Sequence, residues 1–585
     1  MAEKYPAEEN DLSSLFRFFR LILAPERSFY ALAIVYGVGI SLLSLATPVS
    51  VQMLINTVAN IGLTTPLIVL ALSLFVLLMI AGGLNALRIY ILDVFGRRFY
   101  ARIVSEIALR TIYARNPFFD DTGKSALFNR YFDIIIVMKM VPNLLVGGFT
   151  IVLQMVVGFL LVSSYHPLLL AFNLTVAVLI WLVWAIWGRR AIRSAVELSH
   201  RKHYSAGWLE SLGHANGFYK TESHIAEALR NTDAVTGAYM EQHRKHFRHH
   251  FSQTLSFLLI YAAASAALLG VGGWLVISGE LSLGQLVAAE LVLSAVFVGV
   301  SQLGIYMSYF YDVCGAVDEL SLFFKVEQNL PKEAHRRIDG DSSLAFNKVV
   351  VGPTITLDFK IPAGSRVCVY ADSHKAQRVF TNLVRGHEEP DSGYIAVGGV
   401  DLRELKPYEM RQEIIVLDRP NAVETSIREF LRLSAPDGAP VDVMKVLGIV
   451  GLAETVTQLP QGLDTQIVGT GWPLSIVETM QLKLAAAIVS RPRVIVLTQA
   501  YDGMPEVFLL RAMDALQERG ETTIVYFTYE NIDLRFNHYL RLGYEEQVMV
   551  RNYDELCEVM GLAEHPMRVP LSIYGETAVS ADREA

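Results

Sequence analysis

The stretch 485-AAAIVSRPRVIVL-497 passes from an apolar run of helical character, through a charged turn, into a short run rich in β-branched residues. Similar short runs occur at 366-RVCVY-370, 413-EIIVL-417 and 522-TTIVYF-527, each flanked by turn residues and separated by helical patterns. This alternation predicts a parallel sheet covered by helices. We therefore expect residues 342–560 to form an α/β domain.

The chain before this domain is apolar in long blocks. Runs long enough to cross a bilayer, each about 20 residues or more, fall near 28–57, 64–95, 142–164, 167–188, 253–278 and 283–310. Short links without Lys or Arg alternate with the long basic segments 97–141 and 189–252. The positive-inside rule places these long segments, both termini and the α/β domain in the cytoplasm.

These patterns give a domain division. We predict a polar segment with an elbow helix at 1–27, a six-helix transmembrane domain at 28–325, a linker at 326–341, the α/β domain at 342–560 and a polar tail at 561–585. The elbow segment is either a helix lying in the membrane interface or the start of the first span. Apolar spacing of three and four residues predicts that the spanning helices continue beyond the bilayer.

Composition excludes several classes of function. The 585 residues are 52% hydrophobic with a net charge of −8, which gives no reason to expect nucleic acid as a partner. Cys314, Cys368 and Cys557 are far apart, so neither a disulfide framework nor a CxxC metal site is expected. No secretory signal peptide is visible at the start. The histidines in 241-EQHRKHFRHH-250 suit a basic helix end facing lipid headgroups better than a metal site.

Six spans, two long cytoplasmic segments and a C-terminal α/β domain resemble a half-transporter of the ABC exporter superfamily. Three stretches carry the local resemblance: 387-HEEPDSGYIAVGGVDLREL-405, 459-LPQGLDTQIVGTGWPLS-475 and 485-AAAIVSRPRVIVL-497. The turn 279-GELSLGQLVAAE-290 is similar to that of exporters allied to type I secretion. The resemblance covers about residues 12–560 and implies a P-loop-NTPase-like α/β domain, with candidate coupling helices near 116–130 and 220–233.

The resemblance also fixes the register of the phosphate loop, whose pattern is GxxxxGK[ST]. Counted back from 390-PDSG-393, its two glycines fall on Ala371 and Ala376, its lysine on Gln377 and its Mg²⁺-binding Ser/Thr on Arg378. Side chains with a Cβ disfavour the positive φ angles from which backbone N–H groups surround phosphate. Lys375 lies two positions too early, and Arg378 would repel Mg²⁺.

The remaining ATPase positions are replaced as well. The Q-loop glutamine falls on Asp418, and the switch histidine falls on Thr528. The signature LSGGQ becomes 474-LSIVE-478, in which Ser475 is retained and Ile476, Val477 and Glu478 follow it. In the Walker B segment, Thr498 replaces the Mg²⁺-associated Asp and Gln499 replaces the general base. We therefore expect a pseudo-ATPase that binds neither ATP nor Mg²⁺ productively and has no catalytic residue.

These losses leave three hypotheses for function. In the first, the chain is a non-catalytic subunit of an export assembly in the bacterial inner membrane, as a homodimer or with another ABC half-transporter; the secretion-like turn would imply a periplasmic adaptor as co-partner. In the second, it is a permease driven by a proton gradient, with the intramembrane carboxylate Glu290 as the candidate functional residue. In the third, it is a non-transporting scaffold of another membrane complex.

Overall fold

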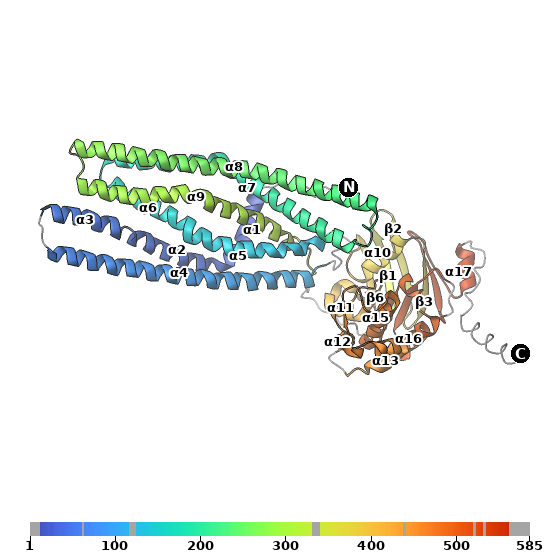
Figure 1. Ribbon diagram of the computed structural model, residues 1–585. Helices are drawn as coiled ribbons and strands as arrows, with labels where there is room; N and C mark the ends of the chain where they lie inside the picture. The colour runs from blue at the N-terminus through green and yellow to red at the C-terminus, as the bar shows by residue number, and fades with distance from the viewer. Residues whose placement is uncertain are drawn as a thin grey trace. The chain divides into compact units, whose positions relative to one another are not determined.

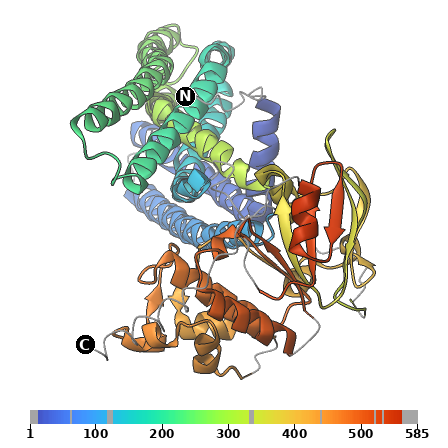
Figure 2. The ribbon, with the colours of Figure 1, turned by 90° about the vertical axis from the view of Figure 1, so that its right-hand side faces the viewer.

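The computed structural model describes residues 12–60, 64–115, 125–329, 338, 340–436, 440–518, 522–530 and 534–560. Contacts between residues divide the chain into two units, residues 1–328 and 329–585. We call them the membrane unit and the α/β unit and describe each by itself. Figures 1 and 2 show the two units in orthogonal views.

The membrane unit is built from helices that run alongside one another (Figure 1). Within the described residues, six helical segments are long and apolar enough to cross a membrane, which agrees with the six predicted runs. The helices are α1 (Leu12–Leu23), η1 (Ala24–Glu26), α2 (Arg27–Leu43), α3 (Ala46–Asn60), α4 (Thr64–Ile112), η3 (Ser125–Tyr131), α5 (Phe132–Asn143), η4 (Leu144–Gly148), α6 (Phe149–Ser163), α7 (Pro167–His214), α8 (Glu222–Ile277) and α9 (Leu283–Phe324).

The predicted extension of the helices beyond the bilayer is confirmed. Helix α7 has 48 residues and α8 has 56, which correspond to lengths of about 72 and 84 Å against a hydrocarbon core of about 30 Å. Their first turns are fixed by local caps: the side chain of His166 accepts a hydrogen bond from the Leu168 amide, and Thr221 accepts one from the His224 amide.

Two local predictions are refined by the helix boundaries. Residues 12–23 form a helix of their own, α1, which a 3₁₀ turn containing Pro25 separates from α2. Buried Leu15 and Ile22 pack it into the same apolar cluster as Phe95 and Phe99.

The candidate coupling helix at 220–233 is not a separate helix, because from Glu222 onward it forms the first turns of the continuous α8. The other candidate, 116–130, lies outside the described residues up to Lys124 and continues as η3 from Ser125.

The α/β unit contains a six-stranded sheet with the order β12-β11-β3-β10-β9-β6. Strands β11, β3, β10, β9 and β6 are parallel and β12 is antiparallel at the edge. The predicted strands correspond to β3, β6, β9 and β10. Their bounds are β3 (Arg366–Ala371), β6 (Ile414–Leu417), β9 (Val494–Leu497), β10 (Thr523–Phe527), β11 (His538–Leu542) and β12 (Gln547–Val550).

A second, antiparallel sheet has the order β2-β1-β4-β5, and β7 pairs with β8. Their bounds are β1 (Leu344–Val351), β2 (Ile355–Ile361), β4 (Ser392–Val397), β5 (Val400–Asp401), β7 (Thr425–Ser426) and β8 (Gln466–Ile467). The helices are α10 (His374–Val384), α11 (Pro407–Glu413), α12 (Ile427–Leu433), α13 (Val443–Ile449), α14 (Ala453–Gln458), α15 (Ile476–Ser490), α16 (Glu506–Glu518) and α17 (Tyr553–Met560). Apolar residues of the six-stranded sheet contribute to two buried clusters, one with α15 and α16 and one with α10 and the antiparallel sheet.

Candidate functional site

The carboxyl edge of the six-stranded sheet brings the predicted ATPase positions together. Val496 of β9 lies beside Val416 of β6 and Val525 of β10, so the parallel strands end at one level. The residues that follow these strands include Asp418 after β6, Thr498 after β9 and Thr528 after β10. Ligands of open α/β sheets bind outside this edge, so the register expected from the sequence places its candidate residues where a nucleotide site would lie.

The link between β3 and α10 is short. Strand β3 ends at Ala371 and α10 begins at His374, so only Asp372 and Ser373 connect them. The Ser373 side chain caps α10 by accepting a hydrogen bond from the Ala376 amide at 3.2 Å. Among described residues with positive φ, none lies between 371 and 378. The segment is therefore a strand–helix turn, and it lacks the wide loop of amides that surrounds phosphate.

Side chains from outside the link hold it in place. Arg541 of β11 donates to both carboxylate oxygens of Asp372 at 3.1 and 3.2 Å. The Ser373 hydroxyl donates to the phenol oxygen of Tyr544 at 2.8 Å, and the Tyr529 hydroxyl donates to the Ala371 carbonyl at 3.2 Å. The Asp372 carboxylate, the Ser373 hydroxyl and the Ala371 carbonyl are thus bonded to groups of the same unit.

A reciprocal pair of amides connects the position of the phosphate-loop lysine to that of the general base. The Gln377 side-chain nitrogen donates to the Gln499 oxygen at 2.8 Å, and the Gln499 nitrogen donates back at 2.9 Å. Gln377 is buried, whereas Lys375 and Arg378 on the same helix are exposed. The pair carries no net charge and offers neither a cation for phosphate nor a carboxylate for Mg²⁺ or water.

The other sequence-predicted positions also form bonds within the unit. Arg385 contacts both carboxylate oxygens of Asp418 at 2.6 and 2.7 Å. The Thr498 hydroxyl donates to the Leu417 carbonyl at 3.2 Å, and the Thr528 hydroxyl accepts from the Glu530 amide at 3.0 Å.

Lys483, which donates to the Arg419 carbonyl at 2.5 Å, lies in the same charged neighbourhood. Burial, together with the positive charges of Arg385 and Arg419, lowers the pKa of Lys483, although the negative charge of Asp418 opposes this shift.

The signature segment begins α15. Ser475 and Glu478 form a capping box, in which the Ser475 hydroxyl accepts from the Glu478 amide at 3.2 Å and the Glu478 carboxylate accepts from the Ser475 amide at 2.8 Å. Glu478 therefore stabilises the helix start. Ile476 and Val477, which the resemblance aligns with the signature glycines, have exposed side chains. Close approach of a phosphate to these amides is restricted by the two β-branched side chains.

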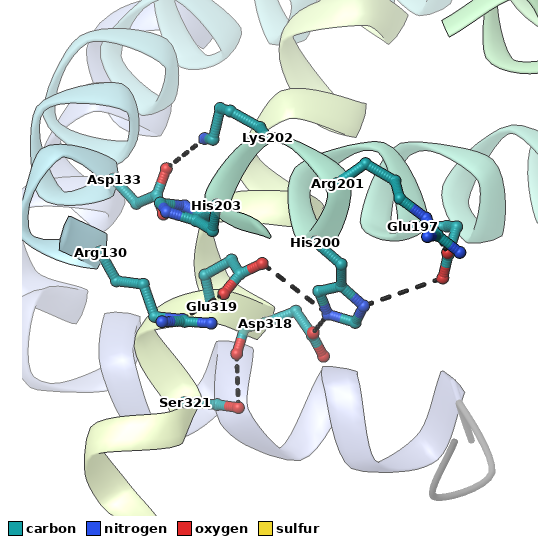
Figure 3. Close-up of polar contacts among 10 residues, drawn as sticks. All are labelled: Arg130, Asp133, Glu197, His200, Arg201, Lys202, His203, Asp318, Glu319 and Ser321. Carbon is teal, nitrogen blue, oxygen red and sulfur yellow. Dashed lines mark hydrogen bonds and ion pairs between the residues drawn. The ribbon is translucent and has the colours of Figure 1, made fainter. Parts of the chain in front are cut away.

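Sequence reasoning missed a cluster of buried charges in the membrane unit (Figure 3). Glu319 of α9 is fully buried and accepts a hydrogen bond from the Arg130 guanidinium at 2.5 Å. Asp133 of α5 is also fully buried and accepts from Lys202 at 2.7 Å and from His203 at 2.5 Å, both on α7. Figure 3 shows these groups converging from three segments of the chain.

A histidine extends this cluster. His200 of α7 lies 2.7 Å from the Asp318 carboxylate of α9 and 3.9 Å from that of Glu319 (Figure 3). We refer to Arg130, Asp133, His200, Lys202, His203, Asp318 and Glu319 as the ionic cluster. It joins η3 and α5 to α7 and α9 through charge-assisted hydrogen bonds. An available signal was the presence of Asp133 and Glu319 among apolar residues, but the sequence gives no pairing between positions so far apart.

Glu290 lies in α9, close to its start. One oxygen of its carboxylate accepts from the Ser294 hydroxyl at 2.9 Å, and the other is buried without a hydrogen-bond partner. Glu290 belongs to the membrane unit, whereas the ATPase positions belong to the α/β unit. Within the described residues, no group of His, Cys, Asp and Glu side chains is arranged to hold a metal ion.

Known proteins share this architecture. Residues 30–237 match the family described as the ABC transporter transmembrane region. A solved structure described as a bacterial Atm1-family ABC exporter with ATP bound superposes with a TM-score of 0.76 at 16% identity, over 94% of this chain and 99% of that one. The chain therefore has an exporter-type transmembrane region and the ABC exporter fold.

Curated proteins with sequence similarity are also transporters by name. The ABC multidrug transporter mdr2 of Aspergillus fumigatus is 24% identical over 86% of this chain and 66% of its own length. The leukotoxin translocation ATP-binding protein LktB of Mannheimia glucosida is 27% identical over 44% of this chain and 38% of its own length. The chain thus matches two thirds or less of these relatives. It is an ABC exporter-like integral membrane protein.

The amide pair can be tested by a double-mutant cycle. Gln499→Ala should lower the free energy of unfolding of the α/β unit by about 1–2 kcal/mol, because it leaves the buried Gln377 amide without its partner. Gln377→Met combined with Gln499→Met should lose less, since both amides are removed. The readout is the denaturant concentration at which the α/β unit becomes protease-sensitive in the detergent-solubilised chain. Gln458→Ala, at an exposed position of α14, is the control, and equal losses for Gln458→Ala and Gln499→Ala would contradict the pairing.

The ionic cluster makes a second prediction. Arg130→Gln should destabilise the membrane unit by about 3–5 kcal/mol because it leaves Glu319 buried and unneutralised. Adding Glu319→Gln should recover part of this loss. Arg201→Gln breaks the exposed pair with Glu197 and should cost no more than about 1 kcal/mol. Thermal unfolding is measured for the native chain, Arg130→Gln, Glu319→Gln, the double variant and Arg201→Gln, and additive effects of the two cluster substitutions would contradict the coupling.

Proposed function

We propose that this chain is a non-catalytic subunit of a membrane export assembly, in which the α/β unit keeps the fold of a nucleotide-binding domain without turning over ATP. The observation that carries the proposal is the Gln377–Gln499 amide pair beside the two-residue link from β3 to α10. These features occupy the positions at which the resemblance expects the lysine, the general base and the phosphate loop.

The expected fall in the rate of ATP hydrolysis supports this proposal. Phosphoryl transfer depends almost entirely on positioning and on electrostatic stabilisation of the transferred group. Loss of a single stabilising donor lowers the rate by about 10²–10³ in enzymes where it has been measured. Here a lysine, a metal ligand, a base and a backbone cradle are all replaced, and Asp418 is paired with Arg385. The energy for transport then comes from another subunit.

The proposed assembly follows from the composite nature of ABC sites, in which the phosphate loop of one chain faces the signature of the other. Both parts are altered here, so a homodimer would hold two inactive sites. A partner half-transporter with an intact phosphate loop would face Ser475 and the start of α15, which can favour phosphate. We assign the chain to the bacterial inner membrane with both termini and the α/β unit cytoplasmic. The turn 279–290 and the similarity to a leukotoxin translocation protein favour a periplasmic adaptor as a further partner.

The composition of the native complex tests this proposal. We expect the chain, extracted in mild detergent through an affinity tag, to copurify with an ATPase subunit in fixed stoichiometry by quantitative mass spectrometry. ATP hydrolysis by that complex should persist when Gln499→Ala is introduced into this chain and should stop when the partner's catalytic glutamate is replaced.

Two other results of this experiment would contradict parts of the proposal. Two copies of this chain with no ATPase present would contradict the export-subunit proposal and favour a scaffold or a gradient-driven permease. Hydrolysis by the purified chain alone would contradict its non-catalytic role.

The unpartnered carboxylate oxygen of Glu290 supports a second candidate function, proton-coupled transport. A carboxylate in a membrane span is costly and is therefore a candidate for function, and one of the two Glu290 oxygens is buried without a hydrogen-bond partner. In this function, Glu290 would take up and release a proton as the membrane unit changes conformation.

A substitution distinguishes this second candidate. The chain in proteoliposomes should collapse an imposed pH gradient, followed with a trapped dye, and Glu290→Gln should slow the protein-dependent rate by roughly 10²-fold because it removes the proton acceptor. Glu280→Gln, at the neighbouring link where Glu280 pairs with His166, is the matched control. An unchanged rate in Glu290→Gln, or no rate above protein-free vesicles in the native chain, would remove this candidate.

A further inference from the structure

A second ionisable residue is buried within the predicted spans. Arg88 belongs to α4, lies inside the apolar run 64–95 and is 3% exposed. It precedes Arg98 by ten residues, and Arg98 pairs with Glu26 at 3.3 Å just before α2 begins. Arg88 thus lies about 15 Å along the helix from this ion pair, on the hydrocarbon side of it.

The partners of Arg88 are neutral. Its two terminal nitrogens donate to the Thr150 hydroxyl at 2.6 Å and to the Asn85 side-chain oxygen at 2.8 Å. Its Nε is buried without an acceptor. No carboxylate of the described residues forms an ion pair with Arg88, in contrast to Arg102 and Arg130 of the same unit. The positive charge is therefore buried without compensation by an anion, which is costly in a medium of low dielectric.

The opposing face of α2 is shaped for close approach. Ala33, Gly37 and Ser41 recur at four-residue spacing and are the buried residues of this helix. A Cβ at Gly37 would lie 3.6 Å from an Arg88 terminal nitrogen, so α2 reaches the guanidinium at this glycine. One turn further on, the Ser41 hydroxyl is fully buried and has no hydrogen-bond partner. Arg88 on α4 and Ser41 on the adjoining α2 thus each have one buried polar atom, Nε and Oγ, without a hydrogen-bond partner.

Exposed apolar residues adjoin Gly37, Ser41 and Arg88 in the sequence. Val38 and Leu42 of α2 and Leu87 and Ile89 of α4 are exposed, and the two helices pack against each other. The surface of these two helices is thus apolar beside the buried polar groups, and a molecule with a hydrocarbon body could lie against it. A guanidinium is suited to carboxylate and phosphate because its N–H groups form a planar fork.

We propose that Arg88 binds the anionic head of an amphiphilic molecule, a carboxylate or a phosphate, that reaches it from the lipid phase between α2 and α4. The head supplies the missing negative charge and accepts hydrogen bonds from Nε of Arg88 and from the Ser41 hydroxyl, while the hydrocarbon part lies against the exposed apolar residues. Two sources share this chemistry: an anionic phospholipid of the bilayer and an acidic amphiphile that is transported. The inference does not depend on whether ATP is hydrolysed.

The test measures binding of defined amphiphiles to the full chain purified in a neutral detergent. Phosphatidylglycerol, oleate and the zwitterionic phosphatidylcholine are titrated, and the rise in unfolding temperature gives an apparent affinity for each. The native chain should bind at least one of the two anionic probes and prefer it to phosphatidylcholine. Arg88→Gln should weaken that binding by roughly 30-fold or more, as expected when one member of a buried charge pair is removed.

A matched variant separates this site from general surface charge. Arg97→Gln removes the same charge from the same helix at an exposed position, where Arg97 pairs with Asp93 at 3.0 Å, and should bind as the native chain does. Equal weakening by Arg97→Gln and Arg88→Gln, or no preference of the native chain for either anion, would overturn the proposal. If Arg88→Gln fails to fold, Arg88→Lys is used instead: it keeps the charge and should retain binding with lower affinity, and unchanged affinity would contradict recognition by the guanidinium.

The two sources give different results in the same preparation. Phosphatidylglycerol that remains bound through purification of the native chain, counted by native mass spectrometry and absent from Arg88→Gln, indicates a resident lipid. Tighter binding of oleate with no retained phospholipid indicates a transported acid. Either outcome supports an anion site at Arg88, and the absence of both contradicts it.

Discussion

A buried polar group without a partner is costly, and this requirement for partners favours many of the side-chain pairs found in both units. In the α/β unit it favours the pairing of Gln377 with Gln499 and of Asp418 with Arg385, at the carboxyl edge of the six-stranded sheet. In the membrane unit it pairs Asp133 and Glu319 with cations from other helices. The requirement is strong because an unpaired polar or charged group in a low-dielectric interior costs several times the net gain of an ordinary hydrogen bond.

The same requirement explains how the fold can persist while the chemistry changes. A buried Lys or Glu at position 377 or 499 would need phosphate, Mg²⁺ or a counter-charge, whereas two glutamines satisfy each other through both donor and acceptor. The apolar strands beneath them, such as Val494–Leu497 of β9, are buried regardless of what binds at their ends. Retention of the exporter fold is therefore compatible with the replacement of ATPase residues that the resemblance implies, and with the proposed role in which a partner supplies the energy.

Much of the fold could be predicted from local patterns. Apolar run length indicated the spans, and β-branched runs indicated β3, β6, β9 and β10, because these signals depend on neighbouring residues. The antiparallel sheet could not be predicted from local patterns, because β1 pairs with β4 across about 40 intervening residues. Leu344 of β1, for example, lies opposite Val397 of β4. The candidate coupling helix at 220–233 forms the start of the continuous α8, a continuity that the local helical pattern does not reveal because it is the same whether or not the helix continues.

The site could be predicted only in part, because the sequence does not show which side chains bond to each other. The resemblance could indicate that Gln377 and Gln499 replace a lysine and a glutamate, but not that the two amides bond to each other. Sequence pattern also does not distinguish Arg88 from Glu290, because both are ionisable residues within apolar runs. Only the structure shows that Arg88 is buried with neutral partners. The ionic cluster depends on pairs between residues on separate helices, such as Arg130 and Glu319, and remained hidden in the sequence.

The central claim is that the carboxyl edge of the six-stranded sheet is closed to nucleotide, and direct binding of ATP tests it. Radiolabelled ATP would be titrated with Mg²⁺ against the full chain in lipid nanodiscs, with filter retention measured against an unlabelled competitor. We predict no saturable binding up to concentrations on the order of 1 mM, equivalent to a binding free energy weaker than about −4 kcal/mol. Saturable binding in the micromolar range that ADP displaces and that Gln377→Ala abolishes would show that the amide pair opens to admit nucleotide, and would contradict the account.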